Sequence, residues 1–368
     1  MPQVLKYAVV FISVVGAFLF LLVPGAWMVA GETVRKLPLK EREVAIERMR
    51  TTMVTAAGGA ALLGGLVFTG LTYRLSRRGQ ETDRYGKAVA QLASSELVER
   101  LGGLYALEHV MRESERDHET IVEVLAAFVR QRASVQRSRN HNSGIAPDVV
   151  AAMVVLARRP QRHETNRVDL RHTELSGLEL PLGARLARFD LREARLIKAQ
   201  LPRVDLTDAW LAGTDMTEAV LSEEADLSGA WLTKATLRET HLEKAKLVAA
   251  KLDEAELIGT RFDGADLTES WLNGATQNGA CFLGSVMERA WLLDLNLESS
   301  QGLTLKRLLT ACPLRSTKLP AGMDNSNTEL HKRIADCQDG PHRHLPERPF
   351  ALKPQVNDAN RGARRRRP

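Results

Sequence analysis

The sequence has few cysteines and few aromatic residues. Three cysteines occur among 368 residues, scattered over the last third of the chain: Cys281, Cys312 and Cys337. Their odd number gives no disulfide framework and favours a reducing compartment. Aromatic residues make up 5% of the chain and charged residues 26%. With this length, the composition predicts two or three domains.

Charge is absent from two long stretches near the N-terminus. Residues 7–31 and residues 51–73 contain no Asp, Glu, Lys or Arg. Each stretch can supply the roughly 20 residues that a bilayer-spanning helix requires. The sequence therefore predicts a transmembrane helical hairpin anchor over residues 1–80, in contact with the lipid bilayer through residues 7–30 and 51–73. Small residues four positions apart in the second stretch would admit a close-packed helix, either the first one or that of a second copy in a homodimer.

Residues 81–165 have the spacing of a small region of packed helices. Apolar residues recur every three or four positions in residues 97–110 and again in residues 121–129, where Asp117 stands at the N-cap position. A third helix is expected to begin with Pro147, because the first helical position needs no backbone donor. The histidines of this region have no partner constellation, so they predict no metal site.

Residues 166–302 repeat every five positions. In ADLSGAWLTKATLRET, residues 225–240, each alanine or its replacement stands two positions before a leucine. A five-residue step would scatter these leucines around a helix, and would send successive leucines to opposite faces of a flat strand. A chain that bends once per repeat and winds into a solenoid points every leucine inward. This register gives 26 repeats, with one extra residue after Leu180 and another after Leu221.

The motif resembles that of the pentapeptide-repeat family, A(D/N)LXX, seen here as ADL at residues 225–227 and 265–267. The segment before the repeats resembles the helical segment of membrane-anchored actinobacterial members, and residues 303–322 resemble a C-terminal cap. Residues 323–368 are polar and are expected to form a disordered basic tail. The resemblance implies that the repeats form a right-handed four-sided β-helix with four repeats per coil. Together with the helices predicted above, the expected fold is two transmembrane α-helices, a small α-helical region and this β-helix.

The sequence shows no catalytic constellation. Inward positions of the solenoid are apolar, so an acid, a base and a nucleophile cannot converge there. Glycines of the repeats stand at turn positions and form no phosphate loop. Cys337, His342 and His344 have a metal-like spacing but lack a fourth ligand. The sequence therefore predicts no enzyme, no cofactor and no metal site.

Binding is the function that remains. The first hypothesis is a membrane-tethered scaffold whose solenoid faces bind a protein partner. The alternative comes from the resemblance, because some pentapeptide-repeat proteins bind type II topoisomerases as acidic, DNA-mimicking rods. Residues 205–301 carry 7 basic and 18 acidic residues, a net charge of −11, whereas residues 167–203 carry 8 basic and 5 acidic residues. The acidic part would repel nucleic acid, so no direct nucleic-acid binding is expected, and it either attracts a basic partner or serves solubility alone.

The cellular location and the membrane orientation are predicted from weaker features of the sequence. Six basic residues in the connecting segment 31–50 are balanced by six in the flanks, so charge does not orient the hairpin. The few cysteines and the family resemblance favour a multi-pass protein of the cell membrane with a cytoplasmic solenoid. The C-terminal run Arg364–Arg367 is either a solvated tail or a contact with anionic lipid.

Four tryptophans are predicted to share one face of the solenoid. Each immediately precedes a repeat centre, where the side chain points outward: Trp210, Trp231, Trp271 and Trp291. Their separations of 21, 40 and 20 residues equal one, two and one coils once the extra residue after Leu221 is counted. They are the candidate partner-binding residues, because tryptophan is enriched at binding hot spots. An aromatic ladder that stabilises the face by stacking is the other interpretation.

Overall fold

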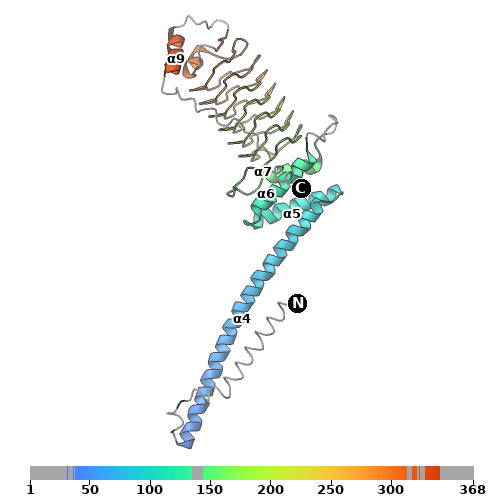
Figure 1. Cartoon of the computed structure of the whole chain (residues 1–368), viewed down its shortest axis with the longest axis vertical. Coiled ribbons are helices and arrows are strands. Elements are labelled where there is room, and N and C mark those ends of the chain that lie inside the picture. The colour runs from blue at the N-terminus through green and yellow to red at the C-terminus, as the bar shows by residue number, and fades with distance from the viewer. Residues whose placement is uncertain are drawn as a thin grey trace, which may run out of the picture. The chain divides into compact units, whose positions relative to one another are not determined.

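The computed structural model describes residues 31, 36, 38–134, 144–312, 317–320, 323 and 328–339. The chain forms two compact units, Met1–Arg84 and Tyr85–Pro368. Helix α4 (Leu39–Leu92) begins in the first unit and ends in the second (Figure 1). The other described helices and the whole solenoid belong to the second unit, which also carries the candidate site.

The predicted membrane-spanning helices fall at residues 7–30 and 51–73. The first range lies outside the described residues. The second lies within α4, yet no helix in the described part of the chain combines the length and the apolar composition that a bilayer crossing needs. The predicted transmembrane anchor is therefore wrong, and so is the multi-pass membrane location that depends on it. Absence of charge is not apolarity, because residues 51–73 include five glycines and five threonines among the Leu, Val and Phe that favour insertion.

Three helices form a small bundle after α4. They are α5 (Leu97–Glu113), α6 (His118–Arg132) and α7 (Pro147–Ala157), and each packs against the other two. Pro147 occupies the first turn of α7, as predicted. Asp117 holds the N-cap position of α6, but its side chain caps no backbone amide there. Its carboxylate instead accepts a hydrogen bond from Ser114 Oγ at 2.8 Å.

A buried carboxylate joins these helices. Asp148 of α7 is 0% exposed and accepts a hydrogen bond from Arg100 Nε of α5 at 2.7 Å. Arg132 of α6 lies 2.9 Å from the same oxygen. Because a buried charge is costly without partners, this three-helix ion cluster is stable only when the helices are docked.

The repeats form a solenoid with four sides joined by parallel bridges. Along one side, bridged residues follow one another every 20 or 21 positions: Asp169, Asp190, Trp210, Trp231, Lys251, Trp271, Trp291 and Cys312. Three further columns of bridges begin at Glu174, Glu179 and Arg185. One coil therefore takes four five-residue repeats, and each repeat supplies one side.

These sides are not β-strands. Every bridge among the described residues is isolated, and no strand forms there. The expectation of a β-helix made of strands is therefore wrong in this respect. A repeat such as residues 226–230 shows the reason: Asp226 makes the bridge, Leu227 is buried, Ser228 and Gly229 turn, and Ala230 is buried again. Five residues leave room for only one bridged position before the chain turns.

The solenoid core follows the predicted register. Repeat centres and the small residues two positions before them are buried, as Leu247 and Ala245 are, while Val248 lies at the surface with a half-buried side chain. Gln277 is the exception among the centres, since it is half-buried. The extra residue after Leu221 lies in a turn where Glu223 and Glu224 are exposed and have φ angles of 65° and 71°. A corner thus absorbs the insertion without changing which side chains point inward.

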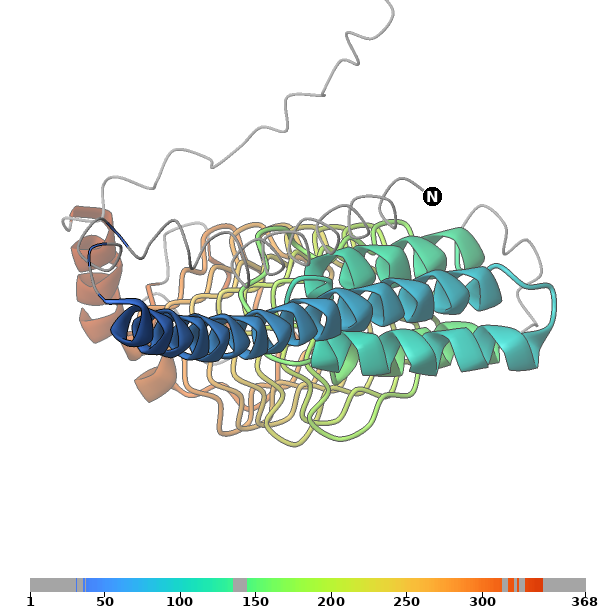
Figure 2. The ribbon, with the colours of Figure 1, turned by 90° about the horizontal axis from the view of Figure 1, so that it is seen from below.

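Helices cover both ends of the solenoid, as Figures 1 and 2 show. At the first end, Ser134 after α6 bridges Thr173, and Ala157 of α7 accepts a hydrogen bond from the Arg185 amide at 3.1 Å. At the other end, α8 (Leu305–Thr310) buries Leu308 and packs against α9 (Thr328–Asp339). Helix α9 lies in the tail for which the sequence predicts disorder, whereas residues 340–368 lie outside the described residues.

Candidate functional site

The four predicted tryptophans lie on one side of the solenoid. Parallel bridges pair Trp210 with Trp231, and Trp271 with Trp291. Lys251 connects the two pairs, because it bridges both Trp231 and Trp271. All four side chains are half-buried, so each ring keeps part of its surface in solvent. We call Trp210, Trp231, Lys251, Trp271 and Trp291 the tryptophan face.

One cation lies between two pairs of rings on this face. The rings of Trp210 and Trp231 lie 5.9 Å apart between centroids, with an angle of 31° between their planes. The ammonium of Lys251 lies 4.1 Å from the ring centroid of Trp231 and 5.9 Å from that of Trp271. A cation over an aromatic ring is attracted by the ring quadrupole. Lys251 therefore fills the gap in the column instead of breaking it.

Two arginines cover the first ring of the face. The guanidinium carbons of Arg167 and Arg192 lie 4.4 Å and 4.7 Å from the ring centroid of Trp210. Asp190 orients Arg192 through hydrogen bonds of 2.8 Å and 2.6 Å to its two carboxylate oxygens. The same bonds raise the pKa of Arg192, which keeps its charge over the ring. Burial and the nearby charge of Arg188 lower the pKa of Arg167.

An acidic side chain lies beside Lys251. Burial raises the pKa of Asp253, although hydrogen bonds from Asn273 act in the opposite direction. Asn273 Nδ2 donates to Asp253 Oδ1 at 2.8 Å, and Asn273 Oδ1 accepts from the Leu293 amide at 3.1 Å. This chain of hydrogen bonds fixes the turns of three successive coils beside the face.

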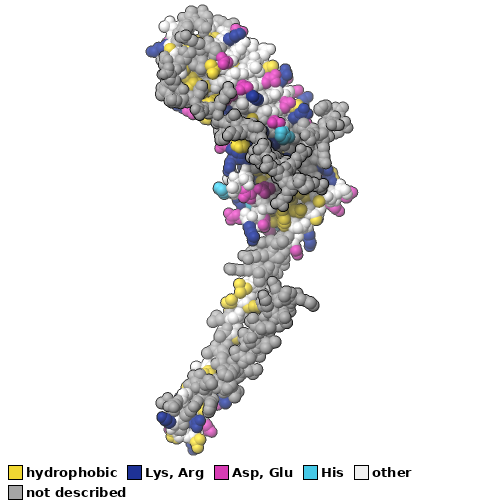
Figure 3. All heavy atoms as spheres, viewed as in Figure 1, with side chains coloured by type: hydrophobic (Ala, Val, Ile, Leu, Met, Phe, Trp, Pro, Cys, Tyr) yellow, Lys and Arg dark blue, Asp and Glu magenta, His cyan; other side chains and the backbone are white. Residues whose placement is uncertain are grey.

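Charges of both signs are interspersed on the visible face of the solenoid (Figure 3). Several ion pairs join the turns of successive coils, including Lys198 with Glu218 and Lys234 with Glu254, each at 3.4 Å between nitrogen and oxygen. Some of the carboxylates of the repeats are therefore paired with lysines along the corners. Exposed pairs of this kind contribute little to stability.

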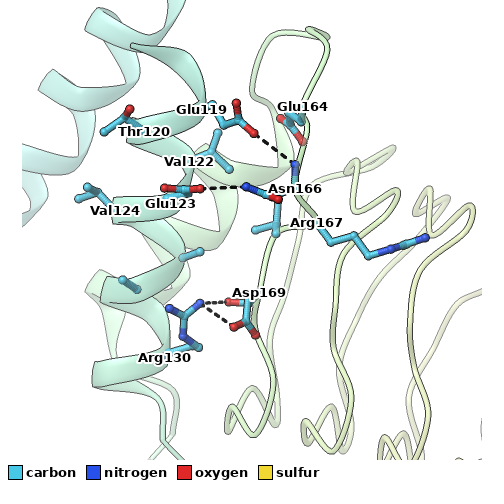
Figure 4. Close-up of a pocket in the computed structure, with 13 residues that line it drawn as sticks. Glu119, Thr120, Val122, Glu123, Val124, Arg130, Glu164, Asn166, Arg167 and Asp169 are labelled. Atoms are coloured by element: carbon cyan, nitrogen blue, oxygen red, sulfur yellow. Dashed lines mark hydrogen bonds and ion pairs between the residues drawn. The ribbon is translucent and has the colours of Figure 1, made fainter. Parts of the chain in front are cut away.

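A cleft lies between α6 and the first coil (Figure 4). Its volume is about 460 Å³. Glu119 accepts hydrogen bonds from the amides of Thr165 and Asn166 at 2.9 Å and 3.2 Å, and Arg130 lies 3.4 Å from Asp169 Oδ2. These polar groups join the helix to the first coil across the cleft, which is consistent with a docking seam.

A second cluster stands beside this seam. Arg159 donates to both oxygens of Glu164, at 2.6 Å and 3.0 Å, and His118 Nε2 lies 3.1 Å from one of them. Burial alone would raise the pKa of Glu164, but the bonds to Arg159 and His118 lower it overall. The cluster joins α6 to the segment that leads into the repeats.

Five-residue periodicity and four bridged sides define a repeat protein of the solenoid class. Residues 203–238, 223–257 and 240–279 match the family model described as pentapeptide repeats, with 8 copies. Residues 203–279 are therefore pentapeptide repeats. The narrower resemblance to actinobacterial members stays a prediction.

Several solved structures are similar to this chain. HetL, a pentapeptide repeat protein involved in heterocyst differentiation regulation from the cyanobacterium Nostoc, is 25% identical, with 43% of this chain and 90% of HetL covered and a TM-score of 0.25. Rfr23 from the cyanobacterium Cyanothece is 26% identical, with 33% and 90% covered and a TM-score of 0.22. QnrB1, a plasmid-mediated fluoroquinolone resistance protein, is 22% identical, with 45% and 83% covered and a TM-score of 0.25. The search of curated proteins gives no match.

Sequence reasoning named the four tryptophans, and placed Lys251 in their column, but not the two arginines that pack on Trp210. Arg192 and Arg167 belong to the preceding coils, and their contacts with Trp210 depend on side-chain direction. The sequence nevertheless held a signal for the Arg192 contact. Asp190 precedes Trp210 in the same column of bridges, and Arg192 follows Asp190 by two positions.

Proposed function

We propose that the solenoid binds a protein partner through the tryptophan face. The observation that carries this proposal is the column of half-buried rings aligned by parallel bridges, with Lys251 between them. Large rings with few rotatable bonds supply contact area at a low cost in entropy, which is why tryptophan dominates binding hot spots.

Contacts within the face prepare it for binding. The tilted contact of the Trp210 ring with the Trp231 ring, and the packing of Lys251 on both neighbouring rings, restrict these side chains before a partner binds. A preorganised surface loses less entropy on association. The column of tryptophans can therefore both stabilise the solenoid as an aromatic ladder and serve as a binding surface. Only the binding role requires a partner.

Charge indicates what this partner presents. Residues 205–301 carry a net charge of −11 around an aromatic column. A partner with apolar groups at its centre and basic residues at its rim would be complementary to this arrangement. Lys251 on the face and Arg192 over its first ring add positive charge to this surface and favour this binding mode over a continuous DNA mimic.

The proposal is tested by replacing all four tryptophans with threonine in the full-length protein. Chemical crosslinking in cells of the source organism, followed by mass spectrometry, measures which proteins are captured by each variant. We expect one or more specific partners to be captured by the unmodified protein and lost from the variant, while the thermal unfolding midpoint shows that the variant remains folded.

The matched control carries four threonines on the opposite side of the same coils. Gln200, Val220, His241 and Gln301 share one column of bridges two repeats away from the tryptophan face. This control variant should retain the partner. Equal capture by both variants would show that the face does not bind, and Lys251→Glu provides a milder test if the quadruple variant unfolds.

A further inference from the structure

Two of the three thiols meet at the C-terminal end of the solenoid. Cys312 follows Trp291 in its column of bridges and is 7% exposed. Cys337 lies on α9 and is half-buried. Although 25 positions separate them in the sequence, the two thiols are joined by a hydrogen bond. This contact links helix α9 directly to the last coil.

Arg333 stabilises the same junction. It stands four positions before Cys337 on α9, and therefore on the same face of that helix. Its Nε donates to the Ala311 carbonyl at 2.8 Å, and its Nη2 lies 3.7 Å from Cys312 Sγ. Leu330 and Ile334 are buried on this helix. The guanidinium is thus held by the backbone of the last coil and directed at the sulfur.

The surroundings make Cys312 the more acidic thiol. The hydrogen bond from Cys337 lowers the pKa of Cys312 to about 7, burial opposes this change, and the charge of Arg333 supports it. Cys281 has the opposite environment, since burial and a hydrogen bond to Asp263 at 2.9 Å raise its pKa. A thiolate is the reactive form of cysteine, so the two sites differ in reactivity.

We propose that Cys312 and Cys337 form a redox modification site, at which a hydroperoxide converts the thiol pair into an intramolecular disulfide that fastens α9 to the last coil. The site rests on the position of Cys337 one turn after Arg333 on α9, on the Arg333 guanidinium 3.7 Å from Cys312 Sγ, and on the packing of α9 against α8.

The reaction balances with hydrogen peroxide as the oxidant. The Cys312 thiolate attacks one peroxide oxygen, the O–O bond breaks, and the leaving hydroxide takes up a proton to form water. Sulfur is thereby oxidised to a sulfenic acid. The Cys337 sulfur then attacks the Cys312 sulfur, the S–O bond breaks, and a second water leaves with the proton of Cys337. Two thiols lose two electrons and two protons in total, and one peroxide becomes two waters.

The test uses the full-length protein, reduced, freed of reductant and exposed to hydrogen peroxide near neutral pH. Remaining thiols are alkylated, and peptides are analysed by mass spectrometry without reduction. We expect a linked pair of peptides containing Cys312 and Cys337, while Cys281 is recovered in alkylated form. Dithiothreitol should restore the separate peptides. Alkylation of both Cys312 and Cys337 at peroxide concentrations that oxidise Cys281 would overturn the proposal, as would disulfides between chains.

Three variants separate the chemistry from folding. Cys281→Ser should form the linked peptides at the rate of the unmodified protein. Arg333→Gln should form them more slowly, because less Cys312 is ionised, and Arg333→Lys should restore most of the rate. An unchanged rate in Arg333→Gln would contradict the role of the guanidinium. Hydrogen exchange in α9 should slow by about tenfold or more once the disulfide closes the loop, and exchange unchanged by oxidation would contradict the fastening of α9.

Discussion

Two hydroxyl groups at equivalent inward positions have different surroundings. Thr260 Oγ1 donates to the Leu237 carbonyl of the preceding coil at 2.6 Å. Ser270 is 0% exposed, and its Oγ has no hydrogen-bond partner among the described residues. A buried polar group without a partner costs free energy, whereas a paired one does not.

We therefore expect Ser270→Ala to stabilise the protein by about 1 kcal/mol. Thr260→Ala should destabilise it by a similar amount, because the hydrogen bond and a methyl group are lost. Urea unfolding measures both differences. A loss of stability in Ser270→Ala would mean that a bound water satisfies the hydroxyl.

The effect of Asp253 on the stability of the fold is expected to depend on pH. Burial raises its pKa in the folded protein. A carboxyl with a raised pKa favours the folded state at low pH, and this contribution is lost as the pH rises through the folded pKa. At neutral pH the ionised form is therefore a cost, and Asp253→Asn should raise the thermal unfolding midpoint at pH 7.

The midpoint gain of Asp253→Asn should shrink as the pH falls below the pKa of the carboxyl. Asn at this position retains an oxygen that can accept from Asn273. Asp205→Asn is the comparison, because Asp205 accepts hydrogen bonds from the Thr207 amide and hydroxyl within its own turn. A gain for Asp253→Asn that does not vary with pH would contradict the assignment.

At the scale of elements, the helical bundle depends on one carboxylate. Asp148 on α7 pairs with Arg100 on α5 and Arg132 on α6. Removing one partner of a buried ion pair leaves an uncompensated charge, which costs about 3–5 kcal/mol. We expect Asp148→Asn to lower the unfolding free energy by this order, whereas Glu115→Gln on the exposed turn before α6 should change it by less than about 0.5 kcal/mol.

Features that depend on neighbouring residues alone, such as a helix start or the burial pattern of a repeat, could be predicted from the sequence. Pro147 marks the start of α7 because its fixed φ suits the first turn. Leu247 and Val248 divide between core and surface as a five-residue period requires. The side chain of Asp117 was not predictable in the same way, since Ser114 competes for its carboxylate. Helix α9 was missed because its buried apolar residues, which are Leu330 and Ile334 among the described side chains, pack against distant parts of the chain.

At the scale of the whole molecule, the coil of 20 residues is the unit of construction. Removing residues 242–261 takes out one complete coil, including Lys251, and should leave Trp231 beside Trp271. We expect this variant to fold and to show stronger coupling between tryptophans in circular dichroism. Removing residues 242–251 is the control, because half a coil would place Trp271 and Trp291 on the opposite side. Equal spectra for the two deletions would contradict the four-sided register.

Only part of the tryptophan face could be predicted from the sequence. Counting coils placed the four rings in one column because the period and the corner insertion at Glu223 are both visible in the sequence. Counting could not show that Arg167 crosses to the ring of Trp210, or that Lys251 contacts two rings. The predicted membrane span at residues 51–73 was wrong for a different reason, since its lack of charge comes partly from glycines and threonines.

The spacing of the bridges also bears on how the protein is made. Each coil pairs with residues only 20 or 21 positions earlier, so a new coil can close soon after its residues leave the ribosome. The bundle that offers Ser134 and Ala157 to the first coil is synthesised before any repeat. We therefore expect the solenoid to assemble from its N-terminal end, as the nascent chain adds coils to the helical bundle that has already folded.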